Sequence, residues 1–105
     1  MRRVARHAKA LATSELSPGQ MKAVDLEGLN ILLANVDAVA YAASNTGIHE
    51  DADLVDGHLE GRSVVRPLHL SEFDLKTGEV GLPPAERPRP VHRAWTKDGY
   101  VHVDV

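Results

Sequence analysis

Two histidines and an arginine lie in neighbouring stretches of the chain that are rich in groups able to bind ions. His49 is part of "TGIHEDA" at 46–52, and Arg66 and His69 are part of "RPLHLSEFD" at 66–74. Imidazole is a common ligand of zinc and iron. A guanidinium stays protonated and has no lone pair to give to a metal. These residues therefore suggest a site that binds ions and contains a fixed positive charge.

One interpretation is a mononuclear metal site at His49 and His69. Two histidines and a carboxylate can together hold Fe(II) or Zn. Arg66 opposes this interpretation, because its charge would repel a cation a few ångströms away. The candidates for a third ligand are Glu50, Asp51, His58 and Glu72.

A second interpretation is an anion site formed by Arg66, His49 and His69. These groups could bind a carboxylate, a phosphate or an acidic side chain of a partner, and binding would tighten at low pH, where imidazole is protonated. The simpler alternative is a salt bridge from Arg66 to one of the nearby carboxylates, which contributes little to stability when it is exposed.

The composition excludes several other kinds of site. The chain has 105 residues and no cysteine, which excludes disulfides, a cysteine nucleophile and any metal held by the chain's own thiolates. The formal net charge of −3 disfavours general binding to nucleic acid. The sequence contains no readable catalytic triad, glycine-rich phosphate loop or nucleotide fingerprint, so we do not expect an enzyme.

The apolar runs and the N-terminus bear on location. No apolar run approaches the roughly 20 residues that span a bilayer, so we expect no membrane association. Residues 1–8 form a basic N-terminal arm with Arg2, Arg3 and Arg6, and this arm lacks the long apolar stretch of a secretory signal. An arm of this kind either docks an acidic partner or is a solvated tail. We expect a cytoplasmic protein.

The two histidine-containing stretches are expected to be loops, and the elements that flank them must position them. Short apolar segments separated by turn residues predict an all-β fold. Within the polar passage 45–61, "HEDADLVDG" predicts a short helical turn that Gly57 closes. The proline-rich segment 81–90 predicts an extended surface connection. The expected strands lie at 21–26, 31–36, 38–44 and 62–65, and the expected hairpins lie at 72–80 and 91–105.

The last hairpin is the clearest element in the sequence. Its turn is Asp98-Gly99, a strong turn dipeptide. We expect His92 and His102 to face each other across this hairpin. The single tryptophan, Trp95, is expected to be a packing residue.

The two histidine-containing stretches resemble the cluster-binding loops of the Rieske family, in particular the small Rieske-type ferredoxins of bacterial aromatic-ring-hydroxylating oxygenases. That family has C-x-H in one loop and C-x-x-H in the other, and these four side chains hold a 2Fe-2S cluster. The resemblance covers residues 9–105 and implies an antiparallel β-sandwich with a two-loop cluster-binding-type subdomain at about 45–75. Its segments are, in order, "ELSPGQMKAVDLEG", "NVDAVAYAASN", "HEDADLVDG", "FDLKTGEV" and "DGYVHVDV".

The chain departs from the family at the ligand positions. The family's two cysteines fall on Gly47 and Arg66, whereas both histidines are present as His49 and His69. Leu70 stands where a glycine is common, and leucine resists backbone angles that glycine allows. We therefore expect no 2Fe-2S cluster and no other cofactor, apart from the mononuclear Fe or Zn considered above.

The resemblance implies a non-catalytic role beside a protein partner. We expect a Rieske ferredoxin-like protein that has lost its cluster and acts as an accessory or interaction subunit of an oxygenase or other redox complex. Relatives present the tip formed by the two loops to their electron partners, so this tip is the predicted contact surface. Its residues are Ile48, His49, Arg66, Leu68, His69 and Leu70.

Overall fold

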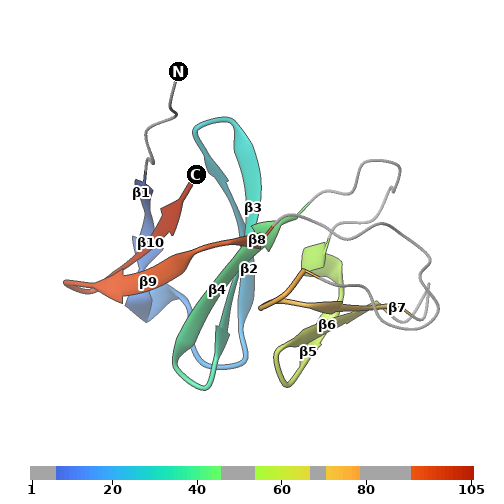
Figure 1. Ribbon diagram of the computed structural model, residues 1–105. Coiled ribbons are helices and arrows are strands. Elements are labelled where there is room, and N and C mark those ends of the chain that lie inside the picture. The colour runs from blue at the N-terminus through green and yellow to red at the C-terminus, as the bar shows by residue number, and fades with distance from the viewer. Residues whose placement is uncertain (1–6, 46–53, 67–70, 79–90) are drawn as a thin grey trace.

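The computed structural model describes residues 7–45, 54–66, 71–78 and 91–105. This part of the chain is built from β-strands and two short 3-10 helices (Figure 1). The elements are β1 (His7–Ala12), η1 (Thr13–Glu15), β2 (Met21–Leu26), β3 (Leu29–Val36), β4 (Val39–Ser44), η2 (Leu54–Asp56), β5 (His58–Glu60), β6 (Ser63–Arg66), β7 (Ser71–Asp74), β8 (Val91–His92), β9 (Ala94–Lys97) and β10 (Tyr100–Asp104). The predicted all-β fold is confirmed.

The middle layer is a four-stranded sheet in the order β2-β3-β4-β8. Strand β3 is its most buried member, since Ile31, Leu32, Leu33 and Ala34 are all at most 1% exposed. Successive side chains of a strand point to opposite faces. Ile31 and Leu33 accordingly enter one core cluster, while Leu32 and Ala34 enter another. The middle sheet is therefore covered on both faces.

The first cluster joins the middle sheet to a three-stranded sheet in the order β1-β10-β9. Val101 and Val103 of β10 supply the buried side chains of this second sheet. They pack against Leu26, Ile31 and Leu33 of the middle sheet. These two sheets form the predicted antiparallel sandwich, and they are the left and central parts of Figure 1.

The second cluster attaches a third sheet, in the order β5-β6-β7, to the other face of the middle sheet. Val64, Phe73 and Leu75 are its buried side chains, and they pack against Leu32 and Ala43 among others. All three strands fall within the subdomain predicted at about 45–75. They lie to the right of the middle sheet in Figure 1.

Several sequence-based predictions of pairing need correction. β1 begins at His7, inside the predicted arm 1–8, because its backbone pairs with β10 from the pair His7–Asp104 onward. β7 pairs with β6, which the sequence did not predict. A turn follows β7 at 75–77, and residues 79–80 of the predicted hairpin 72–80 lie outside the described ranges. Alternation along one strand shows which side chains share a face, but it does not show which strand lies alongside.

The C-terminal hairpin forms as predicted, but the residue that faces His102 across it is not His92. Asp98 and Gly99 have φ angles of 53° and 83°, as a two-residue type I′ turn requires. His102 pairs with Trp95 across β9 and β10. His92 instead belongs to β8 of the middle sheet, and its Nδ1 lies 3.0 Å from the backbone oxygen of Asp104. The predicted facing of His92 and His102 was wrong.

Within the described ranges, no helix has the length and apolar character needed to cross a membrane.

Candidate functional site

Most residues of the predicted loop tip lie outside the described ranges. Gly47, Ile48 and His49 fall within 46–53, and Leu68, His69 and Leu70 fall within 67–70. Glu50 and Asp51 also lie there. The predicted metal site and anion site at His49 and His69 therefore stay predictions.

The strands that carry the two loops are described, and they fix where each loop begins and ends. The backbone of Arg66 is the last of β6 and pairs with that of Ser71, the first of β7. Residues 67–70 therefore connect two antiparallel neighbours of one sheet. Residues 46–53 connect the end of β4, in the middle sheet, to η2, which directly precedes β5 of the third sheet.

A buried asparagine ties together the two ends of the segment 46–53. The side chain of Asn45 is 1% exposed. Its Nδ2 donates to Oδ1 of Asn30, and its Oδ1 accepts a hydrogen bond of 3.0 Å from the backbone N–H of Val55. A buried polar side chain is stable only when its groups are paired in this way. Sequence reasoning missed Asn45, although a single amide directly after an apolar strand could have indicated it.

Gly57 directly follows the 3-10 helix η2, and its backbone is closely packed against β6. A Cβ at this position would lie 2.5 Å from the backbone oxygen of Val65 and 2.9 Å from Cγ1 of Val64. The backbone of residue 57 thus passes directly against β6, two residues after the Val55 contact with Asn45. The predicted short helical turn closed by Gly57 is confirmed for its described part, since η2 (Leu54–Asp56) ends directly before Gly57. Residues 49–53 of the predicted segment lie outside the described ranges. Close packing against β6 is a further reason for glycine at this position.

Arg62, directly before β6, and Asp74, the last residue of β7, form an ion pair at one end of the third sheet. Nε of Arg62 lies 3.1 Å from Oδ1 of Asp74, and the same oxygen accepts hydrogen bonds from the backbone N–H groups of Lys76 and Thr77 at 2.8 and 3.2 Å. Partial burial favours the neutral carboxyl group and raises its pKa, but the hydrogen bonds from Arg62, Lys76 and Thr77 favour the ionised form and lower the pKa by more. The pKa of Asp74 is therefore lowered from its ordinary value of 3.8.

The described candidates for a third metal ligand do not form a metal site with one another. Nε2 of His58 lies 2.9 Å from Oε2 of Glu60 on the same strand. Glu72 is exposed on β7. Among the described residues, no group of three or more His, Asp or Glu side chains is placed to hold a metal ion.

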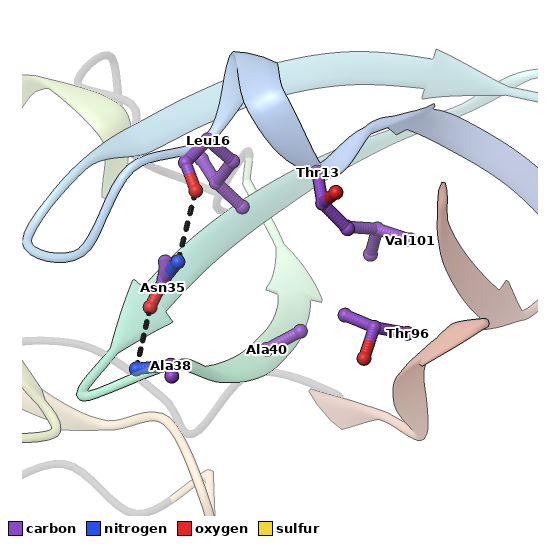
Figure 2. A pocket seen from close by; sticks show the side chains of 7 residues that line it. All are labelled: Thr13, Leu16, Asn35, Ala38, Ala40, Thr96 and Val101. Carbon is purple, nitrogen blue, oxygen red and sulfur yellow. Dashed lines mark hydrogen bonds between the residues drawn. The ribbon is translucent and has the colours of Figure 1, made fainter. Parts of the chain in front are cut away.

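A separate pocket of about 220 Å³ opens at the other end of the sandwich (Figure 2). The side chain of Asn35 links two parts of the pocket lining. Its Nδ2 donates to the backbone oxygen of Leu16 and its Oδ1 accepts from the N–H of Ala38, both at 2.9 Å. None of the lining side chains is titratable, so the pocket offers no group for acid–base or metal chemistry. The lining residues are Thr13, Leu16, Asn35, Ala38, Ala40, Thr96 and Val101.

Comparison with known proteins identifies the class to which this architecture belongs. The family model of the Rieske [2Fe-2S] domain matches residues 7–97. The chain belongs to the Rieske family, and the resemblance found in its sequence is confirmed.

Its relatives include ferredoxin components of dioxygenase systems. The ferredoxin component of the naphthalene 1,2-dioxygenase system of Pseudomonas putida is 38% identical over 72 residues, which cover 69% of each chain. The solved structure of a Sphingomonas yanoikuyae B1 ferredoxin is 26% identical, with a TM-score of 0.84, and the match covers 95% of this chain and 99% of that chain.

A third match is to a solved complex of reduced oxygenase and oxidized ferredoxin in carbazole 1,9a-dioxygenase. The matched chain has a TM-score of 0.82 and 29% identity, and the match covers 93% of this chain and 92% of that chain. The curated relatives are named as ferredoxin components or subunits of dioxygenase systems. These names agree with the expectation of a non-catalytic component.

The donor groups of this chain do not fit the cluster that the family name implies. A Rieske cluster is held by two thiolates on one iron and two imidazoles on the other. The chain contains no cysteine at any of its 105 positions. The backbone of Arg66 stands at the end of β6, where the second loop begins, and a guanidinium cannot donate a lone pair to iron.

Proposed function

We propose that this protein is a Rieske-fold interaction subunit of an oxygenase or other redox assembly and that it carries no 2Fe-2S cluster. The observation that carries the proposal is the absence of cysteine from a chain whose fold and relatives are those of Rieske ferredoxins. Without thiolates, one iron of the cluster would have no ligand from the protein. The function must then lie in binding rather than in electron transfer.

The third sheet has its own means of staying folded without a metal. In many small metal-binding domains the metal supplies much of the folding free energy. Here Val64, Phe73 and Leu75 are buried against the middle sheet. The hydrogen bonds of Asn45 also join the strand β4 to η2 across the first loop. These contacts support a scaffold whose shape does not depend on a cluster.

The proposed contact surface is the tip formed by the two loops. The matched structure of an oxygenase–ferredoxin complex shows that a protein of this fold can bind an oxygenase. Loss of the cluster removes the redox role of the tip and leaves its shape and the charge of Arg66. We propose that the partner contacts Ile48, His49, Arg66, Leu68, His69 and Leu70.

The first experiment is elemental metal analysis, together with a visible absorption spectrum, on protein purified without air and without chelators. The proposal predicts a colourless protein with no stoichiometric metal. Two irons with sulfide would show that the ligand argument is wrong. One iron or zinc per chain, lost in His49→Ala or His69→Ala, would establish the mononuclear site in place of the cluster-free scaffold.

A further inference from the structure

The outer face of the β1-β10-β9 sheet gathers aromatic and basic side chains. Ala94, Val101 and Val103 of this sheet pack into the core. Side chains alternate along each strand, so the residues between them point away from the middle sheet. We call the resulting surface the aromatic–basic face, and it consists of His7, Lys9, Arg93, Trp95, Lys97, Tyr100 and His102.

Three rings at the centre of this face contact one another. His102 is stacked on Trp95, with ring centroids 5.8 Å apart and an interplanar angle of 12°. His7 approaches both rings, with centroid distances of 5.6 Å to each. These rings come from three different strands, so the sheet holds them in a fixed cluster.

Two cations are held over aromatic rings of the same face. Nζ of Lys9 lies 4.3 Å from the ring centroid of Tyr100, and the guanidinium carbon of Arg93 lies 4.9 Å from that of Trp95. A cation over a ring keeps its charge while its position is restrained. The nearest described carboxylate to Arg93 is Asp104, with Nη1 and Oδ2 3.8 Å apart. The positive charge of the face is therefore ordered but only partly neutralised.

His102 has a feature that packing alone does not explain. Its Nδ1 is buried and has no hydrogen-bond partner within the described part of the chain. An unpaired buried nitrogen destabilises the fold. An apolar β-branched side chain at this half-buried strand position would avoid that cost. The ring contacts of His102 with Trp95 and His7 offset part of this cost but leave Nδ1 without a partner in the described part of the chain.

We propose that the aromatic–basic face is a second docking surface and that it binds an acidic segment of a protein partner. Tryptophan, tyrosine and arginine are the side chains that dominate binding energy in protein interfaces. Among the described residues the face carries the cations Lys9, Arg93 and Lys97, and the carboxylate of Asp104 lies beside Arg93, so its charge complements an acidic partner. The formal net charge of the whole chain is −3, which opposes the approach of a long polyanion such as nucleic acid.

The aromatic–basic face and the third sheet lie on opposite sides of the middle sheet. The β1-β10-β9 sheet covers one face of the middle sheet, and the β5-β6-β7 sheet covers the other (Figure 1). The aromatic–basic face lies on the side of its sheet that points away from both. This proposal does not depend on whether a cluster is bound, so it goes beyond the proposed function and can fail separately from it.

The test is a titration followed by the fluorescence of Trp95, the single tryptophan of the chain. A glutamate-rich peptide is added to the full-length protein at low ionic strength, with a glutamine peptide of equal length as the uncharged control. We expect saturable binding of the acidic peptide alone. Lys9→Ala and Arg93→Ala should each weaken this binding roughly tenfold.

Lys76→Ala is the matched control, because it removes an exposed lysine beyond β7, on the other side of the middle sheet. It should leave the dissociation constant unchanged. Arg93 is 77% exposed in its side chain, so its replacement should not prevent folding, which circular dichroism can verify. Absence of saturable binding, or equal weakening in all three variants, would overturn the proposal. Tighter binding of an oligothymidylate of the same charge would overturn the choice of a protein partner.

Discussion

At the scale of single residues, Asp74 has two separable roles in the third sheet. Its carboxylate accepts hydrogen bonds from the backbone N–H groups of Lys76 and Thr77, which close the turn after β7. It also pairs with Arg62 at the edge of β6. An asparagine can preserve the first role but not the second, because its side-chain oxygen still accepts hydrogen bonds and its charge is zero.

Asp74→Ala should lower the free energy of unfolding by about 1 to 2 kcal/mol, because two backbone hydrogen bonds are lost.

Because the pKa of Asp74 is lower in the folded state than the ordinary 3.8, its ionised form stabilises the fold above that pH, and this contribution disappears as the pH falls through the folded pKa. Asp74→Asn should therefore flatten the acid limb of the stability profile. Urea titrations across the acid range can measure this, and an unchanged limb would contradict the assignment.

Gly57→Ala should destabilise the protein by about 1 to 3 kcal/mol, because the added methyl group would collide with the backbone of Val65. Gly61→Ala is the matched control in the same sheet. Gly61 has a φ of 61° and open space around its Cβ position, so alanine there meets backbone strain of about 1 kcal/mol and no collision. Chemical denaturation should rank the two variants in this order, and the reverse order would show that β6 can move aside.

At the scale of elements, the second hydrophobic cluster of the described residues packs the third sheet against the middle sheet. Phe73 of β7 is 4% exposed and packs with Val64 and Leu75 against the middle sheet. Its neighbours along β7 are not buried. The attachment of the third sheet therefore depends on a few large side chains.

Phe73→Ala should cost about 3 to 5 kcal/mol, and the loss should fall first on the third sheet. Hydrogen exchange should show faster exchange in β5, β6 and β7 than in β3. Val101→Ala, in the other core cluster, is the comparison and should leave the protection of β5 to β7 relative to β3 unchanged. Uniform loss of protection in Phe73→Ala would mean that the three sheets unfold as one unit.

At the scale of the whole molecule, the two core clusters lie on opposite faces of one central sheet. Each outer sheet is attached by apolar packing rather than through a described ion site. The proposed cluster-free scaffold predicts that the stability of the fold does not depend on metal.

The melting temperature should accordingly be the same, within about 1 °C, in the presence of a strong chelator and in its absence. A cluster-bearing ferredoxin of the same fold is the positive control and should lose stability when its iron is removed. Differential scanning calorimetry provides the measurement. A clear fall in the melting temperature of this protein on chelation would reveal a stabilising metal.

Much of the fold was predictable from local patterns. The strand 21–26 and the turn at Asp98-Gly99 formed as predicted, because alternation and turn chemistry are properties of neighbouring residues. The partner of β7 and the neighbour of His102 were not predictable in this way. They depend on which strands the folded chain brings side by side, and nothing in the sequence near them encodes that choice.

The sequence by itself determined the chemistry that this protein lacks. The absence of cysteine and the arginine at position 66 follow from composition and position alone, and no arrangement of the chain can supply a missing thiolate. Only the tertiary structure decided which side chains act together. Asn45 meets Val55, and the rings of His7, Trp95 and His102 form one cluster, because contacts between distant residues arise from how sheets pair and pack.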